Sequence, residues 1–476
     1  MSQKTIDIEN PLLADIGRLA DEERTAVYVV GGYVRDRLLG KDAQDIDVVV
    51  LGNGVDFAVK MSKVWNATNV VVYERFGTAM IQLDSRKVEF VGARKESYTK
   101  ESRKPAVDQG TLADDLSRRD FTINAIAASL NRENLGAIED PFDGQADLKR
   151  KKLRTPLDPD KTFDDDPLRI LRAVRFSSQL GFEMEKGIVE AGRAMKERLK
   201  IVSQERISDE FLKMLSSPRP SVGLQAAYDM GLLEIIFPEL ESLAGVDQRQ
   251  EFHHKDVFKH TLMVLDNLSE RTDNVWLRFA GLMHDIAKPR TKAFKEEIGW
   301  TFHGHEELGA RMVRPVFRRM RLPQDHVPYV EKLVRLHLRP MALVDSVVTD
   351  SAVRRLMFDA GNEVDDLMAL CRADITSKNP RLVAHVKKNY ELVIQKMSEV
   401  EEKDRIRNWQ PPLRGEEIME LCSLTPGKLV GILKDRITDA ILDGIIPNDH
   451  DAARGYLLKI KDDIIRDNAG QRPSQK

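Results

Sequence analysis

The stretch VVGGYVRDRLLGKDAQDIDVVVLG, residues 29–52, decides the fold of the N-terminal part of the chain. A short apolar run meets two glycines, Gly31 and Gly32, and the pattern that follows them predicts a short helix. Two aspartates, Asp45 and Asp47, then open a second apolar run that is rich in valine. The order of strand, glycine pair, helix and acidic strand predicts a mixed α/β head.

The glycine pair has two explanations. A joint of strand, two glycines and helix lets backbone N–H groups approach a phosphate at the start of the helix. Arg35, in the first helical turn, could add a charge-assisted fork to the same phosphate. A tight turn without any ligand is the more common explanation of such a pair, so Gly31 and Gly32 alone do not establish a phosphate site.

The two aspartates favour the phosphate explanation. Side chains alternate along a strand, so Asp45 and Asp47 share one face, about 7 Å apart. Carboxylates placed in this way could bridge a pair of Mg²⁺ ions, which would activate an attacking hydroxyl and hold a triphosphate. The alternative is an exposed strand with two solvated acids, but Asp is disfavoured in strands.

Composition and length limit the class of protein. A chain of 476 residues suggests roughly three domains. No apolar run approaches the roughly 18 residues that span a bilayer, and the N-terminus has no apolar stretch of the secretory kind. With only two cysteines, Cys371 and Cys422, we expect a reducing, cytoplasmic environment. The net charge of −3 excludes a coat of positive charge but permits a basic groove.

Changes in the sequence pattern divide the chain into four parts. β-Rich runs occupy much of 26–100, the polar stretch 94–116 is expected to be a mobile loop, and helical periodicity takes over from about residue 155. Most of the ten histidines fall between residues 253 and 337. The expected parts are 1–155, 156–245, 246–380 and 381–476.

The motifs of 29–52 resemble the DNA polymerase β-like nucleotidyltransferase superfamily. They resemble most its bacterial-type class II branch, the tRNA CCA-adding enzymes and poly(A) polymerases. The signature of that branch consists of Gly-Gly, Val-Arg-Asp, Leu-Leu-Gly and Asp-x-Asp. A second motif of that branch is present as RRDFTINAIA, residues 118–127. On a helix, Asp120 and Asn124 would face the same way and could bond a ribose hydroxyl, with Arg119 close to the phosphates.

A further motif, DDPLRILRAVRF, predicts how the base is chosen. Asp166 and Arg169 lie three residues apart on an expected helix. An Asp accepts from the exocyclic amine of cytosine or adenine, and an Arg donates to the neighbouring ring acceptor, so the pair would admit CTP and ATP. Arg172 and Arg175 would bind the triphosphate. Where the resembling family usually has Glu, this chain has Asp165.

Two weaker expectations complete the first site. The motif SQERISDEFLKML at 203–215 resembles the element that closes the neck, where Glu205 and Arg206 would brace the base-selecting helix. Glu89 is a candidate third metal carboxylate, and a surface glutamate is the equal alternative.

A second set of residues predicts a metal cage. The chain contains, in order, His260, His284, Asp285, His305, His337 and Asp374. This order resembles the HD metal-dependent phosphohydrolase superfamily, in its variant with room for two metals. Imidazole and carboxylate ligands suit a divalent transition metal or Mg²⁺. His284 and Asp285 are expected in a helix that Pro289 ends, and Lys288, four residues after His284, would lie near the phosphate. His253, His254 and His303 have no assigned role and are expected in loops.

Together the motifs imply an α+β protein. A polymerase β-like head with a small mixed sheet would be followed by an all-α neck and body, an HD-type helical domain and a helical C-terminal region that contacts tRNA. The expected activity is template-independent addition of CCA to the 3′ end of tRNA from CTP and ATP, with Mg²⁺. Poly(A) addition and C-only or A-only addition remain alternatives, as do an HD hydrolase as the principal activity and an RNA-binding scaffold. The oligomeric state stays open.

Overall fold

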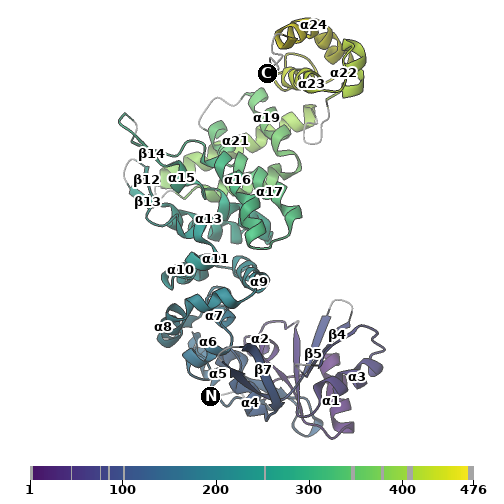
Figure 1. Ribbon diagram of the computed structural model, residues 1–476, viewed down its shortest axis with the longest axis vertical. Coiled ribbons are helices and arrows are strands. Elements are labelled where there is room, and N and C mark those ends of the chain that lie inside the picture. Colours follow the sequence, from purple (N-terminus) through teal and green to yellow (C-terminus); the bar gives the residue numbers. More distant parts are fainter. Residues whose placement is uncertain are drawn as a thin grey trace, which may run out of the picture. The chain divides into compact units, whose positions relative to one another are not determined.

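The computed structural model describes residues 4–43, 45–74, 77–83, 86–99, 102–250, 253–297, 299–344, 349–376, 380–404 and 411–469. The chain forms two compact units, residues 1–241 and 242–476 (Figure 1). Among the described residues, every helix is too short or too polar to cross a bilayer.

The first unit is built on a seven-stranded mixed sheet. Its strands are β1 (Val27–Val30), β2 (Ile46–Val50), β3 (Val70–Tyr73), β4 (Thr78–Leu83), β5 (Arg86–Gly92), β8 (Ala127–Ser129) and β9 (Ile138–Glu139), in the order β3-β4-β5-β2-β1-β8-β9. Only β2 and β5 pair in parallel, and the other neighbours in this sheet are antiparallel. The predicted small mixed sheet is therefore confirmed.

Helices on the two faces of this sheet leave the start of β2 open. Helices α1 (Pro11–Glu22) and α3 (Gly54–Val64) pack against each other and against the sheet. On the opposite side, Val30 and Val49 form a small core with Leu116 and Ala125. Asp47 is the register partner of Val30, so it lies on the same face as this core, at its border.

The prediction of a loop at 94–116 was wrong. Strands β6 (Arg94–Thr99) and β7 (Ser102–Gln109) form a hairpin, and α4 (Leu112–Ser117) follows it. Strand pairing uses backbone groups, so a polar segment can form a ribbon without an apolar face. The helix begins with a reciprocal capping box between Thr111 and Asp114, a signal that the sequence analysis overlooked.

The helix expected across 118–127 is also absent. Helix α4 ends at Ser117, a single 3-10 turn covers Thr122–Asn124, and the chain then enters strand β8. Only Ala127 of this segment belongs to β8, which pairs with β1, and the rest is turn and irregular structure. Asp120 and Asn124 still meet, because Nδ2 of Asn124 donates to Oδ1 of Asp120.

The neck that follows the sheet is mainly helical, with one short parallel pair of strands, β10 (Lys152–Leu153) and β11 (Glu183–Met184), which the all-α prediction did not include. Its helices are α5 (Gly144–Arg150), α6 (Pro159–Asp165), α7 (Leu168–Leu180), α8 (Lys186–Ala194), α9 (Gln204–Leu215), α10 (Pro220–Asp229), α11 (Leu233–Ile236) and α12 (Pro238–Glu241). Helix α7 packs against both α9 and α10. Asp166 lies between α6 and α7 rather than on a helix, because Pro167 cannot follow a residue in the helical conformation without a clash.

The second unit is mainly helical. Its metal-cage part contains α13 (Val257–Ser269), α14 (Val275–Met283), α15 (Lys288–Thr291), α16 (His305–Arg319), α17 (Val327–Leu336), α18 (Arg339–Val344), α19 (Asp350–Ala360), α20 (Val364–Asp374) and α21 (Pro380–Asp404). Two hairpins accompany them: β12 (Asp247–Gln250) with β13 (His253–Asp256), and β14 (Ala293–Lys295) with β15 (Gly299–Thr301).

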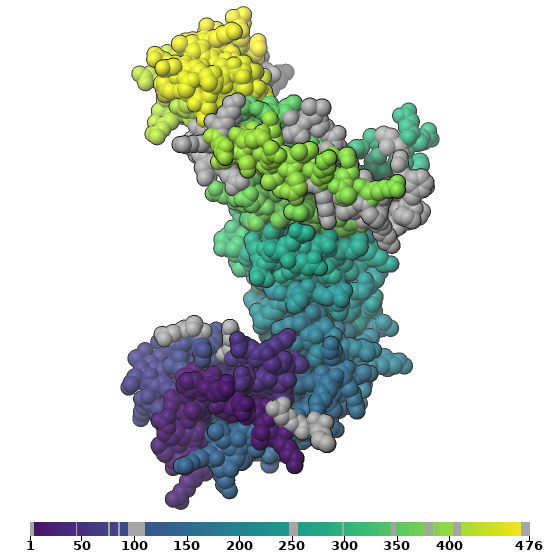
Figure 2. Space-filling view, turned by 180° about the vertical axis from the view of Figure 1, so that it is seen from behind, coloured from purple at the N-terminus to yellow at the C-terminus, as the bar shows by residue number. Residues whose placement is uncertain are grey.

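The last helices have an apolar core of their own. Helices α22 (Gly415–Cys422), α23 (Lys428–Leu442) and α24 (His450–Ala469) enclose Leu413, Ile418, Leu433, Ile437 and Leu457. In the space-filling view their side chains form one compact group, coloured yellow (Figure 2). Arg355 on α19 joins this group through ion pairs with Asp439 and Asp443.

Candidate functional site

A cleft of about 760 Å³ lies in the first unit. It contains most of the head residues that the sequence analysis selected: Gly32, Arg35, Asp45, Asp47, Arg119, Asp120, Asn124, Arg172 and Arg175. The sheet contributes the aspartates, and α7 contributes Arg172 and Arg175. The cleft therefore combines carboxylates with several guanidinium groups, which is the composition that metal-assisted binding of a triphosphate requires.

Asp47 is the second residue of β2, and Asp45 lies just before the strand begins at Ile46 rather than within it, as had been expected. Asp45 is exposed and Asp47 is half-buried. Burial raises the pKa of the Asp47 carboxyl, the Arg119 guanidinium partly offsets that rise, and the Asp45 carboxylate adds to it. Glu89 is the register partner of Asp47 in the parallel pair of β2 and β5, so its side chain lies beside Asp47 on the same face. A dication between these acids would relieve their repulsion, so the donor set fits Mg²⁺.

Gly31 brings the backbone close to the Arg119 guanidinium and the Asp47 carboxylate. Its φ of +70° suits glycine, and a Cβ at this position would lie 2.9 Å from Nη1 of Arg119 and 3.7 Å from Oδ2 of Asp47. The glycine pair thus makes room for the side chains around the aspartates, in addition to forming the turn.

A chain of hydrogen bonds links the second motif to the first. Nη1 of Arg35 donates to Oδ1 of Asn124 at 2.8 Å, and Nδ2 of Asn124 donates to Oδ1 of Asp120 at 3.0 Å. Nε of Arg172 donates to Oδ2 of Asp120 at 2.8 Å. Burial alone would raise the pKa of Asp120, but Arg172 and the hydrogen bond from Asn124 hold it well below its usual range. Asp120 is therefore an ionised anchor for Arg172.

Two residues of this site, Glu210 and Phe176, were not predicted from the sequence. Buried Glu210 on α9 accepts from Nε of Arg175 at 2.5 Å and from Nη1 of Arg172 at 3.4 Å. The Phe176 ring lies 3.9 Å from Cζ of Arg175 and 5.2 Å from Cζ of Arg35. Helical periodicity could have found Glu210, because it occupies the same buried face of α9 as its apolar neighbours.

The expected base-selecting pair is not a direct contact. Oδ1 of Asp166 accepts from the backbone N of Leu168, and Oδ2 pairs with Nη2 of Arg206 at 2.8 Å. The Arg169 guanidinium instead donates to the backbone oxygens of Thr162 and Arg118, at 3.2 and 2.5 Å. Neither Asp166 nor Arg169 lines the cleft described above. Arg206 thus contacts a residue just before α7, and the bracing role of Glu205 and Arg206 stays a prediction.

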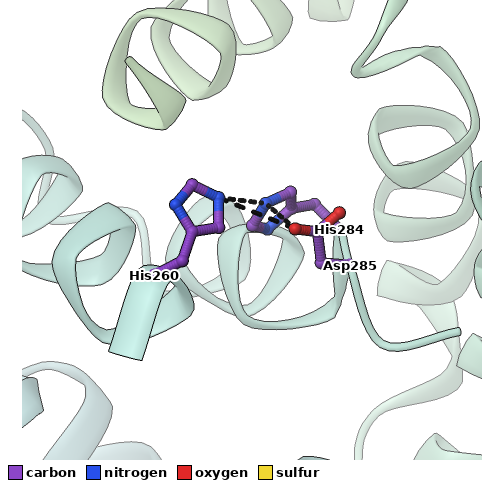
Figure 3. A group of neighbouring side chains, drawn as sticks. All are labelled: His260, His284 and Asp285. Atoms are coloured by element: carbon purple, nitrogen blue, oxygen red, sulfur yellow. Dashed lines mark hydrogen bonds and ion pairs between the residues drawn. The ribbon is translucent and has the colours of Figure 1, made fainter. Parts of the chain in front are cut away.

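The second unit brings the six expected metal-cage residues together. Figure 3 shows His260, His284 and Asp285 converging from α13 and the end of α14. Nε2 of His284 lies 3.4 Å from Nε2 of His260 and 3.2 Å from Oδ2 of Asp285. Oδ1 of Asp285 lies 3.3 Å from Nε2 of His305 and 3.9 Å from Nε2 of His337. Asp285 therefore stands between two pairs of histidines, with ligand-like groups on both sides.

Asp374 closes the cage on the side of His260. Its Oδ1 lies 2.8 Å from Nε2 of His260 and 3.7 Å from Nε2 of His284. Burial alone would raise the pKa of Asp374, but the hydrogen bond from His260 and the charge of His284 lower it to about 2. Burial would lower the pKa of His284, yet Asp285 and Asp374 raise it to about 9. The pKa of His284 is raised and the pKa of Asp374 is lowered, so a positive charge beside these carboxylates is favourable.

The other ring nitrogen of each histidine is held by an oxygen atom. Nδ1 bonds to Gly281 O in His284, to Phe302 O in His305, to Val334 O in His337 and to Thr376 Oγ1 in His260, all within 2.9 Å. Because a carbonyl only accepts, Nδ1 carries the hydrogen in His284, His305 and His337, which directs Nε2 of these three residues toward a metal. The Thr376 hydroxyl can donate or accept, so it holds the His260 ring without fixing its tautomer. Nε2 of His305 and of His337 is buried with no hydrogen-bond partner, so the residues present fit a metal.

Some details of the second site differ from expectation. Helix α14 ends at Met283, not at Pro289, and places His284 and Asp285 just beyond its last turn. Nζ of buried Lys288 donates to Oδ2 of Asp285 at 2.6 Å. His253 and His254 lie in strand β13 rather than in a loop, whereas His303 lies in an exposed turn.

Three family models match the chain. They are the poly(A) polymerase head domain at residues 27–154, the probable RNA- and SrmB-binding site of polymerase A at 181–243, and the HD domain at 257–378. The first covers the aspartates and the second motif, and the third covers the metal cage.

Curated relatives cover most of the chain. An A-adding tRNA nucleotidyltransferase of Deinococcus radiodurans is 34% identical over 339 residues, which is 69% of this chain and 75% of that protein. A multifunctional CCA protein of Vibrio parahaemolyticus is 31% identical over 370 residues, which is 73% of this chain and 84% of that protein.

Solved structures share the fold. A tRNA nucleotidyltransferase complexed with a primer tRNA and an incoming ATP analog matches with a TM-score of 0.58 and 25% identity, over 81% of this chain and 99% of that one. The Bacillus stearothermophilus CCA-adding enzyme in complex with CTP matches with a TM-score of 0.68 and 21% identity, over 97% of this chain and 100% of that one. The expected α+β architecture is thereby confirmed.

Proposed function

Since the chain belongs to the tRNA nucleotidyltransferase family, as its similarity to the A-adding and CCA-adding relatives shows, we propose that it adds CCA to the 3′ end of tRNA from CTP and ATP. One observation carries this proposal: a single cleft combines Asp45 and Asp47 with four arginines. The relative solved with a primer tRNA and an ATP analog supports the choice of substrates.

The chemistry of the first site follows from its residues. Asp45 and Asp47 would hold two Mg²⁺ ions, which when bound lower the pKa of a hydroxyl and neutralise a triphosphate. Arg35, Arg119 and Arg172 orient the nucleotide phosphates. The terminal 3′-oxygen of the RNA forms a bond to the α-phosphorus, the bond to the β-phosphate oxygen breaks, and pyrophosphate leaves.

The choice of base requires a change in the contacts of Asp166 and Arg169. We keep Asp166 and Arg169 as the residues that choose cytosine or adenine, supported by the hydrogen-bonding pattern that both bases share. Asp166 would then exchange its contact with Arg206 for the base, and Arg169 would release two backbone carbonyls.

The finer division into a head, neck, HD domain and tRNA-contacting C-terminal region at 1–155, 156–245, 246–380 and 381–476 belongs to this proposal.

The deciding experiment is nucleotide addition to a tRNA transcript that ends at the discriminator base. CTP, ATP, both together, or GTP and UTP are supplied, and the products are sized at single-nucleotide resolution. Three additions from CTP plus ATP would establish CCA synthesis. A single A on a tRNA that ends in CC, with no use of CTP, would instead assign A-only addition, as in the Deinococcus relative. A long ladder from ATP alone would assign poly(A) synthesis.

For the second site we propose a metal-dependent phosphohydrolase that acts on phosphomonoesters or 2′,3′-cyclic phosphates. The buried, unpartnered Nε2 atoms of His305 and His337 favour it, because such atoms are costly unless a metal binds them. Lys288 would lie near the phosphate. Metal analysis of the purified protein, followed by phosphate-release assays before and after chelation, tests this proposal. A protein without bound metal and without release after reloading would refute it.

We also propose that the protein works in the cytoplasm. Cys371 and Cys422 are both free thiols, as a reducing compartment favours. Fractionation of cells that produce the protein, followed by immunoblotting, would test this.

A further inference from the structure

The hairpin of β14 and β15 exposes two large aromatic rings. Phe294 and Trp300 are register partners, and their ring centroids lie 5.2 Å apart in an edge-to-face arrangement. Phe294 is 57% exposed and Trp300 is 40% exposed. The ribbon of this hairpin projects from the helices of the second unit (Figure 1, label β14). An aromatic pair can stabilise a hairpin, but that role does not require both rings to remain open to solvent.

Two lysines lie beside these rings, and the exposed Glu296 and Glu297 follow in the turn of the hairpin. Nζ of Lys292 lies 4.5 Å from the centroid of Trp300, and Lys295 lies next to Phe294 in β14. Within the described parts of the chain, neither lysine has an ion pair with a carboxylate. Exposed aromatic faces beside unpaired lysines are the combination that binds single-stranded nucleic acid, because bases stack on the rings and phosphates pair with the cations.

The hairpin continues directly into the metal cage. Phe302 follows Trp300 by two residues, about 7 Å along an extended chain. The Phe302 ring lies 5.7 Å from Nζ of Lys288, and its carbonyl oxygen accepts from Nδ1 of the cage residue His305 at 2.8 Å. The exposed rings are thus linked to the cage within a distance that a few nucleotides of extended RNA can span.

We propose that Phe294 and Trp300 form a stacking platform for unpaired bases of the RNA whose terminal phosphate lies at the histidine cage. This inference rests on the hydrolase function proposed above, and it assigns the substrate class of that site: single-stranded RNA ends rather than free phosphate esters. Lys292 and Lys295 pair with the phosphates between the stacked bases. The two aromatic residues act as specificity-determining residues and take no part in the hydrolysis.

The first test measures hydrolysis with two kinds of substrate. Trp300→Ala is expected to raise KM about 10-fold for a short RNA with a terminal 2′,3′-cyclic phosphate, since a stacked base contributes on that order, and to leave kcat nearly unchanged. Trp300→Phe should restore most of the loss. Hydrolysis of bis-p-nitrophenyl phosphate, which has no base, should be the same in all variants. Leu392→Ala, which removes another exposed apolar side chain of the second unit, is the matched control.

The second test needs no catalysis. A short RNA containing 4-thiouridine is irradiated with chelated protein, and the crosslinked peptides are mapped by mass spectrometry. Crosslinks within residues 293–301 that disappear in the Phe294→Ala, Trp300→Ala double variant support the platform. If the wild type gives no crosslinks in this segment, or if Trp300→Ala leaves KM unchanged, the stacking platform is overturned. So would a loss of self-association in Trp300→Ala, because the hairpin would then be a protein interface.

The two proposals can fail separately. If no phosphoester is hydrolysed but crosslinks at 293–301 are found, the hydrolase function fails while the hairpin still binds RNA. If hydrolysis of base-free and RNA substrates is equally insensitive to Trp300→Ala, the hydrolase stands and the stacking platform fails. CCA addition by the Trp300→Ala protein should equal that of the wild type, because the hairpin lies in the other compact unit.

Discussion

At Gly31 the backbone turns with a φ of +70° between β1 and α2 (Gly32–Leu38), and a Cβ would lie 2.9 Å from Nη1 of Arg119. Gly31→Ala should therefore destabilise the head by about 1–2 kcal/mol and also displace Arg119. We expect KM for CTP and ATP to rise about 10-fold, the order of one lost charged hydrogen bond. Gly40→Ala is the matched control, since Gly40 has the same φ with no neighbouring atom within 4 Å of a Cβ. An equal KM in the two variants would contradict the role of Arg119.

Asp47 is half-buried and lines the cleft. Asp47→Asn keeps its shape but removes the charge that a dication needs, so nucleotide addition should fall at least about 1,000-fold, equivalent to about 4 kcal/mol of transition-state stabilisation. Affinity for tRNA should stay near that of the wild type in a filter-binding assay. Asp42→Asn, on the same segment but outside the cleft, should retain full activity. Loss of tRNA binding in Asp47→Asn would show that the residue has another role.

Single residues with chemical constraints were the most predictable part of this protein. Asp47, Arg35 and the cage residue Asp285 all lie where their motifs place them, because metals and phosphates demand particular groups at fixed spacing. The partners of these residues were not predictable in the same way. Glu210 and Thr376 contact the sites from distant helices or loops, and only the folded chain brings them there.

At the scale of elements, α7 and α9 are joined through buried charges. Glu210 on α9 accepts from Arg172 and Arg175 on α7. Removing one partner of a buried ion pair leaves uncompensated charge, so Glu210→Gln should lower the free energy of unfolding of the first unit by roughly 3 kcal/mol. Hydrogen exchange of α7 peptides would measure this loss. Asp209→Asn, an exposed neighbour on the same helix, should change little.

The contact between Asp120 and α7 gives the head an acid-sensitive component. Asp120 has a lowered pKa in the folded state, so its stabilisation is complete above its unfolded pKa, about 3.9. That stabilisation is lost as the pH falls toward the lower folded value. The difference in opening free energy between wild type and Asp120→Asn, measured by hydrogen exchange, should therefore shrink between about pH 5 and pH 3. A difference that is constant over this range would contradict an ionised Asp120.

Element boundaries explain where sequence prediction failed. The segment after α4 was expected to be helical, but it is turn and irregular structure with one 3-10 turn, and it enters strand β8 at Ala127, where pairing with β1 begins. Five of the six metal-cage residues lie at or just beyond the end of a helix: His284, Asp285, His305, His337 and Asp374. His260 alone among the six lies in the interior of a helix. A periodic pattern identifies a helix well, but it cannot show that a helix stops in order to direct a ligand inward.

At the scale of the whole molecule, the two sites belong to separate compact units. The nucleotide cleft lies within residues 31–218 and the metal cage within residues 260–374. No described cage residue contributes to the cleft, so each site has its own charges and its own hydrogen-bond network. Variants in the two sites should therefore act independently, as substitutions without shared partners usually do.

Crossed variants test this independence. Asp47→Asn should abolish nucleotide addition and leave phosphate release unchanged, whereas His284→Ala should abolish phosphate release and reduce the bound metal while nucleotide addition continues at the wild-type rate. The double variant should lose both activities and still bind tRNA. If His284→Ala also lost nucleotide addition while melting at the wild-type temperature, the cage would be required for transfer. The chain would then work as one coupled enzyme, because a folded head with an intact cleft could not act without the metal-binding unit.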